Sequence, residues 1–124
     1  MFVREQALKV FLDDLRRTPP GWQRARTAWE VIEFCEQGNV KVLSLDYDLD
    51  MNPAGYDEHP GTGQNVTTWL LKQAQYGQWE YIPECIVIHS SNFEGVGLMS
   101  WDLAEIERMR WARAVGASPE EAAW

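Results

Sequence analysis

Three short runs of apolar residues have the length and composition of buried β-strands. They cover residues 8–12, 40–46 and 85–88. Residues 22–26 show a weaker pattern of the same kind, which predicts a brief edge strand. Turn-forming residues separate the runs, including Thr18-Pro19-Pro20-Gly21 after the first strand. The pattern therefore predicts a small sheet of short strands.

Three other segments carry apolar residues at the three- and four-residue spacing of a helix that packs on a core. They cover residues 28–37, 63–76 and 98–115. The first opens with Thr27 and Glu30, which have the form of a capping box, and each segment ends at or near a glycine. The stretch 47–61 has no such period and predicts a long loop, and Ser118 predicts the start of a last helical turn.

Strands and helices alternate along the chain, which is the pattern of an α/β domain. We expect a short, mostly parallel sheet with helices packed on its faces, in three layers. The 124 residues suffice for a substantial core, so residues 1–124 are predicted to form a single α/β domain. In such a domain the carboxyl ends of parallel strands share one edge of the sheet, where ligands bind.

Polar residues follow each of the three predicted buried strands. They are Asp13 and Asp14 after the first, Asp46, Tyr47 and Asp48 after the second, and His89, Ser90, Ser91 and Asn92 after the third. Asp46, Asp48 and Asp50 also alternate, so an extended backbone would point all three the same way. One polar strand end can arise by chance, but three on one edge indicate a functional site.

The acids at this edge predict a metal site. Asp13, Asp14 and Asp46 would bring three negative charges together. Such a cluster is stable if a divalent ion lies among the carboxylates or if one of them takes a proton. Hard oxygen ligands suit Mg²⁺ or Mn²⁺, so the expected cofactor is a divalent ion, most simply Mg²⁺. The alternative is that these acids are solvated at the strand ends.

His89, Asp46 and Asp48 are the candidate catalytic residues. A histidine imidazole at the position of His89 can act as a general acid or a general base. A half-buried histidine with a backbone partner fits the same position. Asp48 lies in the long loop, and its side chain can equally point to water.

Arg16, Thr62, Gly63, Ser90 and Asn92 are the candidate phosphate-binding residues. Arg16 follows the acidic pair closely enough to reach the same edge. Thr62 and Gly63 open a predicted helix, and helix N-termini accept anions. Ser90 and Asn92 can donate hydrogen bonds to phosphate oxygens. Capping or turn roles explain Thr62, Ser90 and Asn92 equally well.

The charge of the chain limits the classes of partner. Eleven Lys and Arg against 19 Asp and Glu give a formal net charge of −8. This disfavours binding to duplex nucleic acid or to a membrane, but it allows a small anionic ligand held by local cations or a metal. Cys35 and Cys85 lie in apolar runs, which favours buried free thiols. With no signal-peptide core or membrane-length apolar run, the protein is predicted to be cytoplasmic.

The polar strand ends resemble those of receiver domains of two-component signalling, although no apolar strand ending in Lys follows the last large helix. From Leu8 to Met99 the chain is more similar to a derived family, the cyclic-phosphate processing receiver domains. The motifs that carry this similarity are Phe11-Leu12-Asp13-Asp14-Leu15-Arg16 with Pro19, Ser44-Leu45-Asp46-Tyr47-Asp48-Leu49, Thr62-Gly63, and His89-Ser90-Ser91-Asn92-Phe93-Glu94-Gly95. Tyr47 stands where this family usually has a histidine.

The resemblance implies a receiver-like, flavodoxin-like fold and a metal-assisted phosphoesterase that processes a cyclic phosphate, with ADP-ribose cyclic phosphate as the suggested substrate. The expected partner is then a small anionic nucleotide-like ligand. Tyr47 favours a second interpretation, a catalytically degenerate receiver-like module that binds a nucleotide or a protein partner. Exposed aromatic residues and the tail 117–124 are also compatible with a homodimer.

Overall fold

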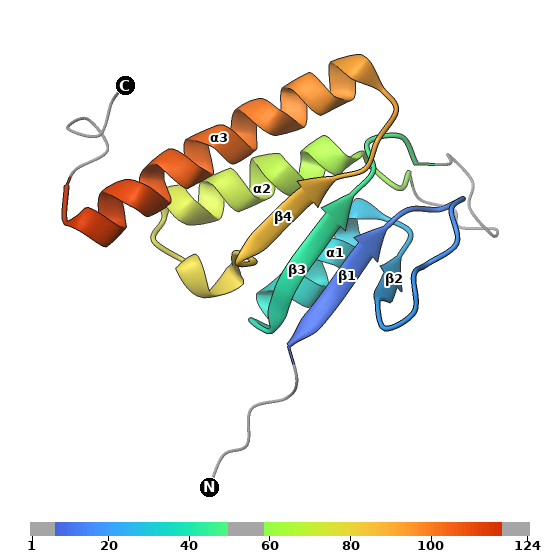
Figure 1. Ribbon diagram of the computed structural model, residues 1–124, viewed down its shortest axis with the longest axis horizontal. Helices are drawn as coiled ribbons and strands as arrows, with labels where there is room; N and C mark the ends of the chain where they lie inside the picture. The colour runs from blue at the N-terminus through green and yellow to red at the C-terminus, as the bar shows by residue number, and fades with distance from the viewer. Residues whose placement is uncertain (1–6, 50–58, 118–124) are drawn as a thin grey trace, which may run out of the picture.

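The computed structural model describes residues 7–49 and 59–117, and its elements follow the order expected from the sequence (Figure 1). The elements are β1 (Leu8–Leu12), β2 (Gln23–Ala25), α1 (Ala28–Glu36), β3 (Val40–Leu45), α2 (Gly63–Gln75), the short 3₁₀ helix η2 (Trp79–Tyr81), β4 (Cys85–Ile88) and α3 (Phe93–Val115). All four predicted strands are present. The 3₁₀ helix was not predicted.

The strands of the described residues form one sheet in the order β2-β1-β3-β4. Every neighbouring pair is parallel, with β1 between β2 and β3, and β3 between β1 and β4. The predicted α/β class with a short parallel sheet and a receiver-like fold is therefore confirmed. Parallel pairing also places the carboxyl ends of all these strands at one edge of the sheet (Figure 1).

The core lies between the helices and one face of the sheet. Alternate residues of the two central strands, among them Val10, Leu12, Leu43 and Leu45, are fully buried in one cluster with side chains from the helices. The helix members of this cluster are Ala28, Val31, Cys35, Val66, Leu70, Ala74, Met99 and Ile106. The described helices thus all contribute to the same sheet face, and Figure 1 shows α1 and α2 behind the sheet. The third layer that was expected on the other face is not seen among the described residues.

The opposite sheet face carries the intervening residues. Lys9 and Cys85 are exposed there, and the Val87 side chain is 44% exposed. Phe11 and Ser44 are buried on this face near the carboxyl edge, at 8% and 5% exposure. Their burial has a local cause, because the ring of His89 stacks on Phe11 and the ring of Trp22 approaches Phe11 edge-on.

Two predictions about the second half of the chain were wrong. Helix α3 begins at Phe93, five residues before the expected start, because the side-chain oxygen of Asn92 accepts the backbone N–H of Gly95 at 2.9 Å and caps the helix. Cys85 is exposed because its side chain lies on the sheet face that the described helices do not cover and β4 is an edge strand, whereas Cys35 is buried as expected. Both thiols are free, as predicted. The helical turn predicted from Ser118 lies outside the described residues.

A buried carboxylate joins the two longest helices. Asp102 of α3 is 8% exposed, and its carboxylate accepts hydrogen bonds from the hydroxyls of Thr67 at 2.7 Å and Thr68 at 3.3 Å, both on α2. Buried polar groups need such partners. In the described ranges, no helix combines the length and the apolar character needed to cross a membrane.

Candidate functional site

The polar residues at the carboxyl edge are held side by side by the backbone. Each of Asp13, Asp46 and His89 extends the ladder one step past its strand by donating its N–H to a carbonyl of the neighbouring strand. These hydrogen bonds are Asp13 N to Ala25 O (3.1 Å), Asp46 N to Leu12 O (3.0 Å) and His89 N to Leu45 O (2.9 Å). Parallel pairing therefore fixes the spacing of the three side chains.

Asp13, Asp46 and His89 form the one group of potential metal ligands found in the described part of the chain. One ligand atom from each residue lies within 4.8 Å of those of the other two. We refer to these three residues as the edge cluster. Asp14 was predicted as a third carboxylate ligand, but it is not a member of this group. The expected convergence of the three strand ends is confirmed. The third member of the group is His89 and not Asp14.

Asp13 is held as a carboxylate. Its side chain is 1% exposed, and each oxygen accepts two hydrogen bonds. Oδ1 accepts the backbone N–H groups of Leu15 (2.8 Å) and Arg16 (2.9 Å), and Oδ2 accepts Arg16 Nη1 (3.0 Å) and His89 Nε2 (3.0 Å). Burial alone would raise the pKa of Asp13, but these donors together lower it below the ordinary value of 3.8.

Asp46 is shifted in the opposite direction. Burial and the nearby charge of Asp13 raise the pKa of Asp46 above 3.8, against the opposing effects of the Tyr47 N–H, the Ser90 side chain and Arg16. Its Oδ1 accepts the Tyr47 N–H at 2.8 Å. Two carboxylates with pKa values pushed apart can take different roles, one staying ionised and the other exchanging a proton.

Arg16 lies at the predicted edge and joins the two carboxylates. Its Nη1 is 3.0 Å from Asp13 Oδ2 and 3.5 Å from Asp46 Oδ2. The hydrogen bond to Asp13 raises the pKa of Arg16, so the guanidinium is a permanent cation. Nearly half of its side chain is exposed, at 48%. The guanidinium therefore balances the carboxylates while keeping room to move.

Both ring nitrogens of His89 have protein partners. Nε2 is 3.0 Å from Asp13 Oδ2, and Nδ1 is 2.6 Å from the Ser44 hydroxyl. Because ionised Asp13 can only accept, we assign the proton to Nε2 and the role of donor to the Ser44 hydroxyl. The imidazole stacks on Phe11 with ring centres 4.3 Å apart and an interplanar angle of 3°. Ser44 and Phe11 thus orient His89 with its N–H toward the edge cluster.

Ser44 and Phe11 were missed as site residues. The signal for Ser44 was its hydroxyl inside a predicted buried strand, where a polar group needs a partner. In the parallel register Phe11 pairs with Ser44, so the two side chains share a face, and the ring of His89 covers that face. The register of β1 against β3 was needed to see this, and the sequence does not give it.

Asp48 lies apart from the edge cluster. It is exposed, and its Oδ2 accepts a hydrogen bond from Asn92 Nδ2 at 2.9 Å. The other side-chain atom of Asn92, Oδ1, caps α3 through the Gly95 N–H. The capping interpretation of Asn92 is therefore confirmed. Asp50 and most of the long loop lie outside the described residues. The common direction expected for the three aspartate side chains can therefore be compared only for Asp46 and Asp48. Those two differ, because Asp48 is bonded to Asn92 and is not part of the edge cluster.

Tyr47, which stands where the resembled family has histidine, packs against α3. A Cβ atom at Gly95 would lie 2.2 Å from Cγ of the Tyr47 ring, so only glycine leaves space for the phenol there. Tyr47 is half-buried and lies among the residues packed against the core. Its ring therefore has a structural role.

Thr62 and Gly63 open α2, as predicted, and Gly63 packs directly on the edge. The N–H of Gly63 donates to Tyr47 O at 3.1 Å, and a Cβ at this position would lie 2.2 Å from the carbonyl oxygen of Asp46. The N–H of Thr62 donates to Asn65 Oδ1 at 2.8 Å, which supports its reading as the helix cap. The start of α2 thus holds the end of β3 in place.

The comparisons with known proteins agree with this arrangement. The profile of one family, described as Cyclic-phosphate processing Receiver domain, matches residues 8–105. This range includes Asp13, Arg16, Asp46, Thr62 and His89. No curated protein and no solved structure matches the chain. Because the match covers most of the 124 residues, the chain belongs to the family of cyclic-phosphate processing receiver domains.

Proposed function

We propose that the protein is a metal-assisted phosphoesterase that hydrolyses a cyclic phosphate of a nucleotide-like small molecule, of the ADP-ribose cyclic phosphate type. The observation that carries this proposal is the edge cluster, where Asp13, Asp46 and His89 lie within 4.8 Å of one another with Arg16 beside them. Two carboxylates, an imidazole and a guanidinium supply ion binding, proton transfer and phosphate recognition at one place.

The edge cluster has the chemistry of a site for a hard divalent ion. Asp13 and Asp46 would hold it through carboxylate oxygens, which Mg²⁺ and Mn²⁺ prefer. A cation there would offset the charge repulsion that contributes to the raised pKa of Asp46. When bound, such an ion activates water and neutralises charge on the phosphate. Arg16 now donates to the same carboxylates, and its exposed side chain can turn toward a phosphate instead.

The protein groups fit the proton balance of ring opening. The oxygen of water bonds to phosphorus while one ester P–O bond breaks, the water loses a proton, and the leaving oxygen gains one. Asp46 would accept the proton from water. His89 would enter this step as the imidazolium, with Nδ1–H donating to the Ser44 hydroxyl, and its Nε2–H would protonate the leaving oxygen, which leaves the neutral ring. The product is an acyclic phosphate monoester.

A specific observation favours the alternative, a receiver-like module that binds its ligand without turnover. The family histidine is replaced by Tyr47, and the phenol packs into the space left by Gly95. If the family histidine moves a proton, this chain has lost that group, and His89 is the imidazole that remains at the described edge. Binding of the same ligand would survive this loss.

Turnover of a panel of cyclic phosphates, including 2′,3′-cyclic AMP and ADP-ribose cyclic phosphate, with and without Mg²⁺, tests the proposal. We expect Mg²⁺-dependent release of an acyclic monoester. His89→Ala should lower turnover by roughly a hundred- to ten-thousand-fold, the usual contribution of a positioned acid or base. Unchanged turnover in His89→Ala would refute the mechanism. Tight binding of a cyclic phosphate without turnover would establish the alternative.

A further inference from the structure

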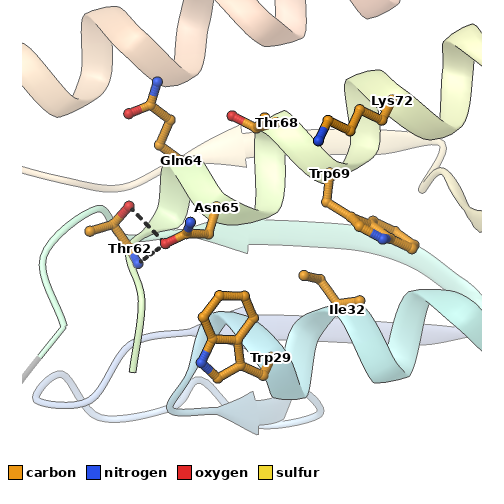
Figure 2. Close-up of a pocket in the computed structure, with 8 residues that line it drawn as sticks. All are labelled: Trp29, Ile32, Thr62, Gln64, Asn65, Thr68, Trp69 and Lys72. Carbon is orange, nitrogen blue, oxygen red and sulfur yellow. Dashed lines mark hydrogen bonds between the residues drawn. The ribbon is translucent and has the colours of Figure 1, made fainter. Parts of the chain in front are cut away.

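A pocket of about 430 Å³ lies between α1 and α2, separate from the edge cluster. Its walls include Trp29 and Ile32 from α1 and Thr62, Asn65, Trp69 and Lys72 from the start and body of α2 (Figure 2). None of Asp13, Asp46 and His89 lines it. The volume is within the range of roughly 300–1,000 Å³ that small-molecule sites occupy.

Contacts within the protein orient both indole rings of the pocket. Trp29 is 42% exposed, and its Nε1 donates to the carbonyl oxygen of His59 at 3.0 Å. The Trp69 ring stacks on Tyr81, with ring centres 6.0 Å apart and an interplanar angle of 25°. Rigid aromatic walls on facing helices suit a flat ring, because little side-chain freedom is lost on binding.

The polar part of the wall is neutral or positive. Lys72 is the one charged residue among the described residues that line the pocket, and Figure 2 shows its ammonium turned back toward Thr68 and Trp69. In a chain of net charge −8, a pocket edge without carboxylates favours an anionic ligand. The amide of Gln64 and the Nδ2 amino group of Asn65 can pair with the edge of a heterocycle, while Asn65 Oδ1 caps α2 and the Thr68 hydroxyl donates to Asp102.

The pocket and the edge cluster meet at the first turn of α2. Thr62 lines the pocket, and its neighbour Gly63 packs on the Asp46 carbonyl and donates to Tyr47 O. Adjacent Cα atoms are about 3.8 Å apart, so the pocket wall at Thr62 and the backbone contact of Gly63 with Asp46 belong to one turn of the chain. A nucleotide that runs over this turn would place its base in the pocket and its phosphate at the edge cluster.

We propose that this pocket binds the nucleobase of the ligand whose phosphate lies at the edge cluster. The inference rests on the proposed function for the position of the phosphate. The base would lie against the Trp29 and Trp69 rings, with Lys72 above it. The substrate class is thereby narrowed to nucleotides, and a cyclic phosphate on a sugar without a base is a poor ligand.

Calorimetric titration of the full chain with AMP and with ribose 5-phosphate, both in Mg²⁺, tests the pocket without relying on turnover. We expect AMP to bind roughly tenfold tighter or more, as base–aromatic stacking provides. Trp29→Ala should remove this advantage and leave the affinity for ribose 5-phosphate unchanged. Trp101→Ala is the matched control, because Trp101 is 72% exposed on α3 and does not line the pocket.

Lys72→Glu is the second variant, since an exposed lysine can be replaced without disturbing the core. It should weaken AMP binding more than ribose 5-phosphate binding. Equal affinity of the wild type for the two ligands would overturn the inference, and so would AMP binding that neither variant weakens. Trp29-dependent AMP binding without any cyclic-phosphate turnover would retain the pocket and reject the phosphoesterase. If both variants hydrolyse a cyclic phosphate with the KM of the wild type, the phosphoesterase proposal stands and the base-binding pocket is rejected.

Discussion

Two regions of the molecule bury carboxylates, and they do so in different ways. Asp102, between α2 and α3, is a single acid whose partners are the hydroxyls of Thr67 and Thr68. At the sheet edge, Asp13 and Asp46 are two acids close enough to affect each other, with a guanidinium and an imidazole as partners. Asp102 is satisfied by neutral hydroxyl donors, whereas the sheet edge brings two carboxylates and a guanidinium together.

The difference separates an acid that joins two helices from a pair of acids with the features of the proposed site. Asp102 satisfies its hydrogen bonds by joining two helices. At the edge, the pKa of Asp13 is lowered and that of Asp46 is raised, so the two carboxylates share one place with unequal affinity for protons. Such a pair is costly for folding and is expected where chemistry or ion binding uses it.

The largest effect is expected when the edge pair is broken. Asp13→Ala should abolish the single divalent site in calorimetry and lower turnover roughly a thousandfold or more, because a bound ion contributes several kcal/mol to charge stabilisation. Asp102→Asn is the matched control: it also removes a buried charge, and it should keep both the ion site and turnover. Full Mg²⁺ binding in Asp13→Ala would mean that the cluster holds no ion.

Removing a hydrogen-bond partner of Asp102 should lower the stability of the protein and leave turnover unchanged. Thr67→Val removes the 2.7 Å hydrogen bond to Asp102 and leaves that buried carboxylate with the longer bond from Thr68. We expect a loss of about 1–3 kcal/mol in the free energy of unfolding, measured in urea, with turnover per folded molecule unchanged. Thr67→Ser keeps the hydroxyl and should recover most of the loss. A change in turnover without one in stability would assign Asp102 to the site.

On the proposed mechanism Ser44 positions His89, and its replacement should have an intermediate effect. Ser44→Ala removes the donor to His89 Nδ1, so the ring is no longer held with its N–H toward the cluster. We expect kcat to fall about tenfold, because the loss of one hydrogen bond costs about 1.4 kcal/mol. KM should be unchanged, and the pH–rate profile should shift. Ser44→Thr retains the hydroxyl and should restore the profile. Equal behaviour of the two variants would indicate a packing role alone.

The smallest effect concerns pH and the metal-free fold. The pKa of Asp46 is higher in the folded state than in the unfolded state. At pH values between these two pKa values the folded state binds more protons, so the free energy of unfolding falls as pH rises through this range. Asp46→Asn keeps an oxygen for the Tyr47 N–H and removes the charge. Above the folded pKa it should therefore be more stable than the wild type.

Urea titrations in a chelator from pH 4 to pH 7 measure this difference. The stability gap between Asp46→Asn and the wild type should widen as pH rises from 4 and then level off. The contribution of Asp13 to the free energy of unfolding changes with pH in the opposite direction. Because its pKa is lowered in the folded state, Asp13 stabilises the fold above pH 3.8, and this stability is lost as pH falls further. A gap that narrows with rising pH would contradict the raised pKa of Asp46.

The strands and the shared edge were predictable because buried parallel strands read as apolar runs ending in polar residues. Residues 8–12 and 85–88 were placed to the residue. The start of α3 was not, since Gly95 and Gly97 weaken the helical pattern and Asn92 reads as a turn as readily as a cap. Cys85 appeared buried because an apolar run does not reveal that its strand lies at the edge of the sheet.

The residues of the site were easier to predict than their contacts. Asp13, Asp46, His89 and Arg16 were identified because each lies at or near the end of a strand. The bonds of His89 to Ser44 and Asp13 depend on strand register and ring orientation, which no local pattern encodes. The packing of Tyr47 on Gly95 joins residues far apart in the chain, so it appears only in the fold.

The position of Arg16 has a consequence for how the protein would respond to its ion. The guanidinium is covalently tethered to the site it neutralises, so it acts as a built-in competitor whose local concentration is on the order of millimolar or higher. On the proposed function, an incoming divalent ion would have to displace this competitor, and its apparent affinity would be weaker than the carboxylates alone would give. Occupancy would then follow the free ion level of the surroundings, and each ion bound would release one arginine toward the incoming phosphate.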